Sequence, residues 1–345
     1  MKPIESSAAR LGAIRLGRSD QPIRLAFLLA PQFPMLAFAS AVEPLRAANR
    51  LAERQLFEWR LTSVDGSPAM ASNAIPIAVH EPLEQLAKVD IVVVCAGLEP
   101  LQFGRNHKIH HHLRRLARHG AMIGAISSGA FILADAGVLA GHRSTVHWEY
   151  ADLFRCRYPA LKLSRDLYVF DRDVFTCSGG TAALDMMLHF VSETCGPRLA
   201  LAVAEQFIHP RIRREEEEQR SEIQARYAID SPRLVRIIEM MEAALEEPLP
   251  MRDIARRAGI SARQVERLFR EQLGVSPTTF YLQRRLERAK ALLRQTLHPI
   301  REVALECGFG STAHLSHAYK KVFGLAPTQE RLRAAGRPAR PAATQ

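Results

Sequence analysis

The first two thirds of the chain alternate short, uninterrupted apolar runs with longer stretches that mix apolar and polar positions. The apolar runs are followed by turn residues, which is typical of strands buried on both faces of a sheet. The mixed stretches have the character of amphipathic helices. We therefore expect strands at Ile23–Ala30, Asp90–Gly97 and Ala121–Ser127, and helices at Leu36–Leu51, His107–His119 and Ala130–Ala136.

This strand–helix–strand order predicts an α/β domain with a parallel sheet covered by helices on both faces. A smaller strand pair, Leu167–Phe170 and Asp173–Cys177, flanks a turn of sequence DRD. Two helices, Thr181–Thr194 and Pro197–His209, then close the domain, which we place at residues 22–210.

The remaining residues form a charged segment and then an all-helical region. Residues 211–231 mix charges densely and hold few apolar positions, so we expect a linker or an exposed helix. The second domain spans residues 232–333, and residues 334–345 form a polar, proline-rich tail that we expect to be disordered. The expected helices are Leu234–Glu246, Arg252–Ala258, Ala262–Leu273, Thr278–Gln295, Ile300–Glu306 and Thr312–Phe323.

The helical region repeats itself. Ala255 and Gly259 recur 49 residues later as Ala304 and Gly308, whereas later positions recur after 50, so the second turn holds one extra residue. The pairs at the longer offset are Val265 and Leu315, Phe269 and Tyr319, Gly274 and Gly324, and Pro277 and Pro327.

Each repeat fits a helix-turn-helix. The small Ala255 allows a close helix crossing, Gly259 supplies a left-handed residue that ends the first helix, and Ser261 can cap the second. Val265 and Phe269 then face inward at helical spacing. Such hairpins also occur in proteins that bind nothing, but two in tandem with basic outward faces favour binding to DNA.

The charge distribution supports a nucleic-acid partner. From Asp230 onward there are 20 basic and 12 acidic residues, so this third carries +8 of the net charge of +11. Thr278–Gln295 would span about 27 Å, which allows the two second helices to enter successive major grooves. The predicted DNA contacts are Arg263, Gln264, Glu266, Arg267 and Arg270 in the first unit, and Thr312, Ser316, His317, Lys320 and Lys321 in the second.

Within that set, Arg263, Glu266, Arg267, Thr312, Ser316 and His317 are expected to reach base edges. Lys320, Lys321, Arg284 and Arg285 are expected to contact phosphates. The segment from Pro232 to Arg333 resembles the AraC/XylS family of DNA-binding domains through GISARQVERLFREQLGVSPTTFYLQRRLERAKALL and ALECGFGSTAHLSHAYKKVFGLAPTQER. The resemblance implies a transcription regulator that binds promoter DNA. The family often has Arg where this chain has His317, which implies weaker or altered reading by the second unit.

The first domain contains a strand–turn–helix at Ser127-Ser128-Gly129 that is typical of a nucleophile elbow. His147 is a candidate base, and Glu43 follows the first strand. The domain resembles the PfpI-type, class I glutamine amidotransferase-like fold, and more narrowly the version found in GlxA-like regulators. The matching stretches are FPMLAFASAVEPLRAANRL, AISSGAFILADAGVLAGHRSTVHWEY and FTCSGGTAALDMMLHF. This resemblance implies a flavodoxin-like sheet.

Enzymes of that superfamily usually carry Cys at the elbow, whereas this chain has Ser127 with no cysteine beside it in the sequence. A serine is a poor nucleophile without a bonded base, so we expect a sensor pocket rather than an enzyme. An amidase or hydratase that uses Ser127 is the alternative. The ligand-binding candidates are Glu43, Ser127, Ser128, His147 and Trp148, with a cation-binding aromatic wall of Trp59, Trp148 and Phe33 as a further hypothesis.

The resemblance implies a small-molecule effector of the amino acid or quaternary amine class, an activator of a catabolic operon, a homodimer and RNA polymerase as a partner. Five scattered cysteines without a CxxC motif favour a reducing compartment and predict no metal centre or cofactor. We find neither a secretory signal nor an apolar stretch long enough to span a membrane, so we expect a cytoplasmic protein without a membrane partner.

Overall fold

The computed structural model describes residues 21–86, 89–97, 106–219, 223–296 and 298–334. The chain divides into two compact units between Gln219 and Arg220. The tail predicted at residues 334–345 lies outside the described residues except for its first residue. The two units correspond to the two predicted kinds of domain, one α/β and one all-helical.

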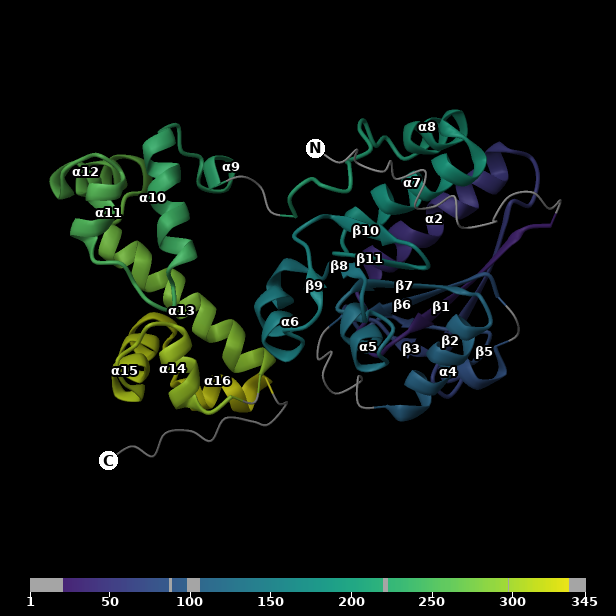
Figure 1. Cartoon of the computed structure of the whole chain (residues 1–345), viewed down its shortest axis with the longest axis horizontal. Helices are drawn as coiled ribbons and strands as arrows, with labels where there is room; N and C mark the ends of the chain where they lie inside the picture. Colours follow the sequence, from purple (N-terminus) through teal and green to yellow (C-terminus); the bar gives the residue numbers. More distant parts are fainter. Residues whose placement is uncertain (1–20, 87–88, 98–105, 220–222, 297, 335–345) are drawn as a thin grey trace. The chain divides into compact units, whose positions relative to one another are not determined.

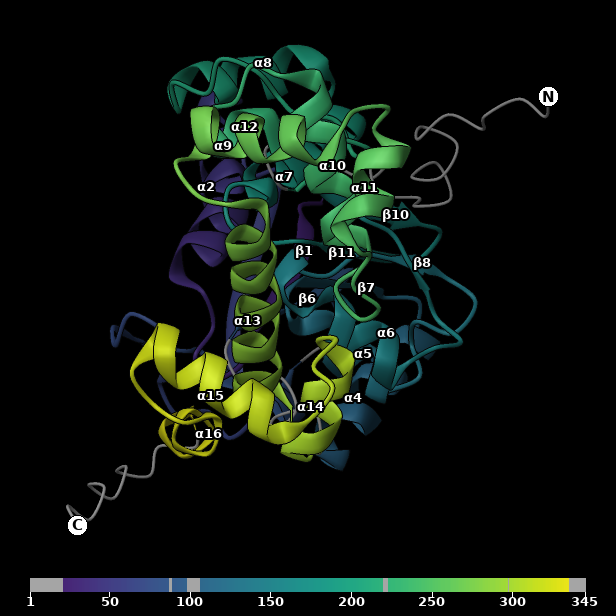
Figure 2. The same cartoon turned by 90° about the vertical axis from the view of Figure 1, so that its left-hand side faces the viewer.

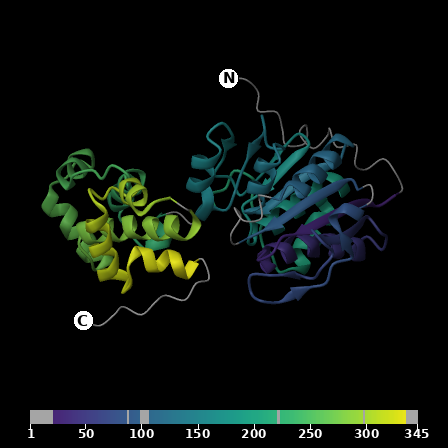
Figure 3. The ribbon, with the colours of Figure 1, turned by 90° about the horizontal axis from the view of Figure 1, so that it is seen from below.

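The first unit is built on a seven-stranded sheet in the order β10-β11-β7-β6-β1-β2-β5. Neighbouring strands are parallel except β10 and β11, which form an antiparallel hairpin across the predicted DRD turn. Figure 3 shows the twisted strands side by side. Their bounds are β1 Ile23–Leu29, β2 Phe57–Ser63, β5 Glu81–Pro82, β6 Ile91–Ala96, β7 Met122–Ser127, β10 Tyr168–Asp171 and β11 Val174–Cys177.

Helices cover both faces of this sheet, as the sequence predicts (Figure 1). Apolar side chains of α2, α7 and α8 pack on one face, and those of α4, α5 and α6 pack on the other. The two layers bury the hydrophobic cores of the unit between helices and sheet. The bounds are α2 Met35–Leu51, α4 His107–Arg118, α5 Gly129–Asp135, α6 Ala151–Arg157, α7 Ala182–Cys195 and α8 Pro197–Gln206.

The sequence analysis missed strand β2 and several short elements. The sequence of β2, FEWRLTS, places charged residues among apolar ones, and its middle residues are only partly buried because it lies near the edge of the sheet. A strand of this kind lacks the continuous apolar signal of a central parallel strand. The other missed elements of this unit are helix α6, Ala151–Arg157, the strands β3 Ala69–Met70, β4 Pro76–Ile77, β5 Glu81–Pro82, β8 Arg143–Ser144 and β9 Lys162–Leu163, and the 3-10 turns Leu83–Gln85 and Trp148–Tyr150.

Residues 207–219 form a strap on the first unit, so the first half of the predicted linker is anchored to this unit. Asp185 of α7 is fully buried and accepts hydrogen bonds from the Arg213 backbone N–H (2.7 Å) and guanidinium Nε (2.8 Å). His209 Nε2 lies 2.8 Å from the same carboxylate. These partners compensate the burial of the Asp185 charge, which would otherwise be costly.

The end of the strap is held by Gln219. Its side-chain amide donates to Thr145 Oγ1 (2.9 Å), to the Val146 carbonyl (3.1 Å) and to the Asp166 carbonyl (3.0 Å). Val146 directly precedes the candidate residue His147. The strap therefore ends beside the segment that carries part of the predicted sensor site.

The second half of the predicted linker belongs to the second unit. Helix α9, Ile223–Tyr227, lies beside α10, Pro232–Ala243, and Ile223 and Ile229 are buried in the same core. Arg226 forms an ion pair with Glu242 of α10 at 3.0 Å. The sequence suggested a linker here because it is charged, but many of those charges are paired within the two units.

The second unit is helical throughout, as predicted. Helix α13 is one residue longer than expected because Pro277 occupies its first position, where a missing N–H costs nothing. The remaining helices agree with the sequence prediction to within a few residues, and a final helix, α16, was not predicted. Their bounds are α11 Met251–Arg257, α12 Ala262–Leu273, α13 Pro277–Gln295, α14 Ile300–Glu306, α15 Thr312–Phe323 and α16 Pro327–Ala334.

Helix α13 is shared by two hydrophobic cores (Figure 2). Its first half contributes Phe280 and Tyr281 to the core of the first repeat. Its second half contributes Leu286, Ala289 and Leu293 to the core of the second repeat. One helix of 19 residues, about 28 Å long, therefore fixes the separation of the two helix-turn-helix units.

The repeat in the sequence corresponds to a repeat in backbone geometry. Gly259 (φ 67°) and Gly308 (φ 71°) both adopt the left-handed conformation that ends the first helix of each unit. In each unit the residue after the glycine donates its N–H to the carbonyl of the alanine that both repeats share. These bonds join Ile260 to Ala255 (3.1 Å) and Phe309 to Ala304 (2.8 Å). This is the Schellman closure that the glycine spacing predicts.

Arg285 of α13 does not have the predicted role of a phosphate contact. Its Nε donates to the Cys307 carbonyl (2.8 Å) and its Nη2 to the Gly308 carbonyl (2.5 Å), while the guanidinium lies 4.3 Å from the centroid of the Phe309 ring. Phe309 lies in the turn that holds the extra residue of the second repeat. Arg285 therefore fastens α13 to the second turn, and burial lowers its pKa.

Arg284 is also held within the second unit rather than presented to a phosphate. It forms ion pairs with Glu242 of α10 (3.4 Å) and with Glu287, and only 19% of its side chain is exposed. The sequence analysis could not detect this role because Glu242 lies far from Arg284 in the sequence. The partners of both arginines depend on tertiary packing.

Replacing Arg285 by glutamine should lower the free energy of unfolding of the second unit by about 1.5–3 kcal/mol, because two carbonyls lose a charged donor. Urea unfolding of the full chain would measure this loss. Arg285→Lys should recover only part of it, since an ammonium cannot donate in the same fork geometry. The exposed Arg256→Gln serves as the control and should change stability by less than about 0.5 kcal/mol. Equal stability of Arg285→Gln and the unmodified chain would contradict the assignment.

Candidate nucleic-acid interface and sensor site

The second helix of the first repeat, α12, presents the predicted DNA-contacting residues on its outer side. Ser261 caps the helix by accepting the Gln264 N–H at 3.2 Å. Val265 and Phe269 are fully buried, as predicted. The remaining candidates are all exposed: Arg263, Gln264, Glu266, Arg267 and Arg270.

Gln264 has a structural contact that the sequence analysis overlooked. Its side-chain oxygen accepts the backbone N–H of Ser261 at 2.8 Å, which completes a capping box. The signal was present in the sequence, because Ser followed three residues later by Gln is a typical capping pattern. Because the cap occupies the side-chain oxygen of Gln264, this residue is less able to form hydrogen bonds with a base edge.

Two ion pairs along α12 organise its charged surface. Glu266 pairs with Arg270 at 3.4 Å, and Arg267 pairs with Glu271 at 3.7 Å, both with the spacing of one helical turn. Exposed pairs of this kind contribute little to stability. They can therefore open at low cost when a stronger partner such as a phosphate or a base approaches.

The second helix of the second repeat, α15, has a different electrostatic character. Ser311 caps it by accepting the His314 N–H at 3.1 Å, and Leu315 and Tyr319 are fully buried. The predicted contacts Thr312, His317, Lys320 and Lys321 are exposed, and Ser316 is half-buried. Within the described part of the chain, neither lysine forms an ion pair with an acidic side chain.

The strand–turn–helix of the first unit has the geometry of a nucleophile elbow. Ser127 ends β7 with a left-handed φ of 60°, and α5 begins two residues later at Gly129. A Cβ atom on Gly179 would lie 2.9 Å from the Cβ of Ser127, so only glycine fits at that approach. Ser128 donates its hydroxyl to the Gly97 carbonyl at 2.6 Å, which anchors the turn to the strand next to it.

His147 is not positioned as a base for Ser127. In the described residues its ring contacts Glu149 at 3.6 Å, Trp148 at 5.4 Å between ring centroids, and Tyr150 at 6.3 Å, and no hydrogen bond joins it to the Ser127 hydroxyl. Burial lowers the pKa of the His147 imidazole, so the neutral form is favoured. The alternative of a Ser–His hydrolase therefore has no support from this geometry.

The structure brings cysteines close to the elbow that the sequence does not. Cys95 of β6 and Cys177 of β11 both pair with Ile126, the residue before Ser127, from the two neighbouring strands. Burial raises the pKa of Cys177 to about 12 and raises that of Cys95 as well. Both thiols are therefore protonated near neutral pH and poor nucleophiles.

The remaining ligand-binding candidates do not gather at one place. Glu43 of α2 forms an ion pair with Arg46 at 2.6 Å on the same helix. Phe33 is fully buried against Phe38, whereas Trp148 is 42% exposed beside His147. Trp59 lines a groove with three arginines. A single aromatic wall for a cation is therefore wrong, because these rings belong to separate environments.

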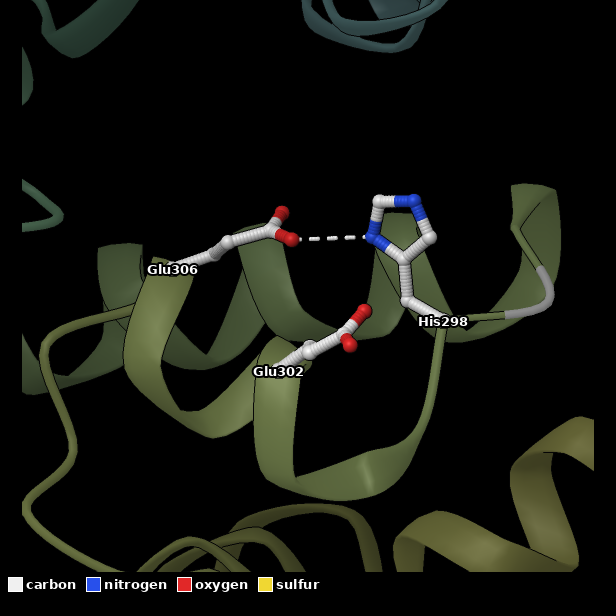
Figure 4. A group of neighbouring side chains, drawn as sticks. All are labelled: His298, Glu302 and Glu306. Carbon is white, nitrogen blue, oxygen red and sulfur yellow. Dashed lines mark hydrogen bonds and ion pairs between the residues drawn. The ribbon is translucent and has the colours of Figure 1, made fainter.

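Three potential metal ligands come together in the second unit, in the turn before α14 and along that helix (Figure 4). His298 Nδ1 lies 2.8 Å from Glu306 Oε1, and the ligand atoms of His298, Glu302 and Glu306 all lie within 4.8 Å of one another. The sequence analysis named no metal ligands, although the spacing of four residues was a signal. The hydrogen bond between His298 and Glu306 already ties the preceding turn to the helix.

No helix in the described residues combines the length and apolar character needed to cross a membrane.

Comparison with known proteins agrees with both units. Residues 24–193 match the DJ-1/PfpI family and residues 254–333 match a helix-turn-helix domain. The chain is 42% identical to the HTH-type transcriptional regulator CdhR of Pseudomonas aeruginosa over 88% of this chain and 90% of that protein. It is 38% identical to the HTH-type transcriptional regulator GlxA of Rhizobium meliloti over 90% of this chain and 96% of that protein.

A solved structure of an AraC family transcriptional regulator from Pseudomonas putida is 28% identical, with a TM-score of 0.50, and covers 54% of this chain and 100% of that one. Together with the two relatives, it supports the flavodoxin-like fold and the AraC-type character that the sequence predicts. The chain therefore belongs to the HTH-type transcriptional regulators that join a DJ-1/PfpI domain to an AraC-type helix-turn-helix domain, and it is a DNA-binding regulator of transcription.

Proposed function

We propose that the protein is a metabolite-responsive activator that inserts α12 and α15 into successive major grooves on one side of promoter DNA. The observation that carries this proposal is the sharing of α13 between the two cores, because this helix, about 28 Å long, sets how the two units are spaced. Successive major grooves on one side of a duplex lie about 34 Å apart, and two units that pack along one helix of this length are suited to enter neighbouring grooves.

The two second helices read DNA in different ways. Arg263, Glu266 and Arg267 of α12 contact base edges, because Arg can pair with guanine and Glu can accept from cytosine. Thr312, Ser316 and His317 of α15 reach the other groove with smaller or neutral side chains. The lysines at the end of α15 contact phosphates, which gives affinity without sequence information. His317 makes the second contact set the weaker one.

The first unit acts as a sensor and not as an enzyme. Ser127 has no bonded base among the described residues, and the buried thiols of Cys95 and Cys177 are protonated, so an activated nucleophile is missing there. Ser127, His147 and Trp148 line the sensor site in this proposal, while Ser128 is fully buried and anchors the turn that carries Ser127. The effector is a small polar metabolite of the amino acid or quaternary amine class, and Trp148 offers an exposed aromatic surface for it.

Communication between the units runs through the strap. Gln219 is bonded to the Val146 carbonyl, next to His147, and only residues 220–222 separate it from Ile223 in the core of the second unit. A ligand that moves the His147 segment therefore changes the position of Gln219. The change reaches α9 and the first repeat because the connection is short, provided the ligand binds one arrangement more tightly than the other.

The remaining features of the proposal follow from the regulatory role. An activator of a catabolic operon works in the cytoplasm, contacts RNA polymerase at the promoter, and binds as a homodimer when two copies are needed to occupy the operator. No cofactor or metal is needed for this activity.

Replacing Arg267 by alanine should weaken binding to the operator by about 1–3 kcal/mol and relax discrimination at one base pair.

Lys321→Ala should weaken binding to all sequences and flatten the dependence of affinity on salt, since it removes one phosphate contact. Fluorescence anisotropy with a duplex selected from a random library, and with bulk DNA, would measure both. If Arg267→Ala lost the same affinity for both DNAs, Arg267 would contact only phosphates. If Lys321→Ala left the salt dependence of the affinity unchanged, Lys321 would not lie in the DNA interface.

Replacing Gln219 by alanine should uncouple the units. A thermal-shift screen of amino acids and quaternary amines identifies the effector, because a ligand at 100 times its dissociation constant adds about 2.7 kcal/mol to the unit that it binds. In Gln219→Ala this shift should persist, while most of the effect of the effector on DNA affinity is lost. Gln206→Ala, which alters a glutamine outside the strap, should keep both responses. Full coupling in Gln219→Ala would contradict the relay.

A further inference from the structure

A groove of about 520 Å³ lies between the C-terminal half of α2 and the beginning of β2. The groove is largely open to solvent, so a ligand bound there would stay partly exposed. No role has been assigned to it in the preceding sections, and the sequence analysis singled out only one of its residues, Trp59. The lining residues are Arg46, Asn49, Arg50, Arg54, Gln55, Phe57, Glu58 and Trp59.

Three arginines dominate this groove. Arg46, Arg50 and Arg54 are spaced by four residues, and Arg46 and Arg50 lie one helical turn apart on α2, about 6 Å along its axis. Like charges at this spacing repel one another. Glu58 is the single acidic residue in the lining, so the groove carries an excess of positive charge.

The partners of these arginines leave that excess largely uncompensated. Arg46 is paired with Glu43, but Arg50 donates to the neutral side chain of Gln206 at 2.7 Å. Within the described residues, the Arg54 guanidinium has no carboxylate partner. Two of the three cations are therefore available to an anion that enters the groove.

The turn into β2 that borders the groove is fixed by hydrogen bonds. Asn49 accepts the backbone N–H groups of Leu56 (2.8 Å) and Phe57 (2.9 Å) and donates to the Phe57 carbonyl (2.8 Å). These three bonds fix the turn between α2 and β2. Trp59 is half-buried two residues later, on the same face of the strand as Phe57. The groove is thus bordered by a fixed turn and is lined by the half-buried ring of Trp59 as well as by the three arginines.

A simpler explanation accounts for only part of this arrangement. Cations at the C-terminus of a helix compensate its macrodipole, which explains Arg50 in the last turn of α2. It does not explain Arg54, which lies beyond the end of the helix, nor the presence of Trp59 in the lining.

The groove is distinct from the elbow. It adjoins Phe57, the first residue of β2, whereas Ser127 is the last residue of β7. Both strands run in the same direction in the parallel sheet, so their beginnings and ends lie at opposite edges. A ligand in the groove therefore would not compete directly with one at the elbow.

We propose that this groove is a second ligand site, which binds a small organic anion with two acidic groups, carboxylate or phosphate, and an apolar part that lies against Trp59. Two acidic groups match the two guanidinium groups that lack a carboxylate partner, Arg50 in the last turn of α2 and Arg54 just after the helix. A cation is excluded by the three arginines, which replaces the earlier hypothesis of Trp59 as part of a cation-binding wall.

The test uses the full chain with Trp148→Phe, because the protein has two tryptophans and this substitution leaves Trp59 as the single fluorescent reporter. Pyrophosphate, citrate and phthalate are titrated separately at constant ionic strength. At least one should change the Trp59 emission saturably below about 10 mM, within the ordinary range of weak metabolite sites. Preference for pyrophosphate would indicate a phosphorylated ligand, and preference for citrate or phthalate a dicarboxylate.

Matched charge variants locate the site. Arg50→Gln and Arg54→Gln should each weaken the response about tenfold or more, as expected when one charge-assisted contact is lost. Arg60→Gln removes an equal charge from the exposed residue after Trp59, which points to the other face of β2, and should leave the response unchanged. Thermal unfolding confirms that each variant is folded.

Three results would overturn the proposal. The first is the lack of a saturable change with all three anions. The second is an equal response of Arg54→Gln and Arg60→Gln. The third is a loss of affinity for bulk duplex DNA, with a flatter salt dependence, in Arg54→Gln, since this would make the arginines phosphate contacts of DNA.

Discussion

The helix that two cores share is the constraint on which the function of this protein depends. Phe280 and Tyr281 bury one half of α13 in the first repeat, while Leu286 and Leu293 bury the other half in the second. Neither helix-turn-helix can rotate freely, because a turn of α13 would expose apolar side chains of both cores to water. The Arg285 contact to the second turn adds a directional bond to this packing. Specific recognition of DNA by two small units requires this fixed separation.

The segment that joins the two units is short in sequence. A long flexible linker would let each unit act independently, but here the strap belongs to one unit and α9 to the other, with residues 220–222 between them. Asp185 is the anchor of the strap, since its buried carboxylate is paired with Arg213 and lies in hydrogen-bond contact with His209. In the proposed mechanism, a change at the effector site reaches the first repeat through this connection.

The sequence was sufficient for the fold class and for most helices, because apolar periodicity and the paired glycines are local signals. It also identified the exposed residues of α12 and α15, since these follow from the buried positions of the same helices. It failed where a side chain finds a distant partner: Arg284 and Arg285 are held inside the second unit, and residues 211–219 are bound to the first. Strand β2 was not predicted because charged residues interrupt its apolar pattern.

The most direct test of the account is the dependence of binding on the distance between half-sites. A duplex selected by the full chain is compared with one in which five base pairs are inserted between the halves read by α12 and α15, which turns one groove to the opposite side. The rigid α13 predicts that affinity falls about a hundredfold or more, toward the level of non-specific DNA. Equal affinity for the two duplexes would show that the units bind independently and would contradict the shared-helix account.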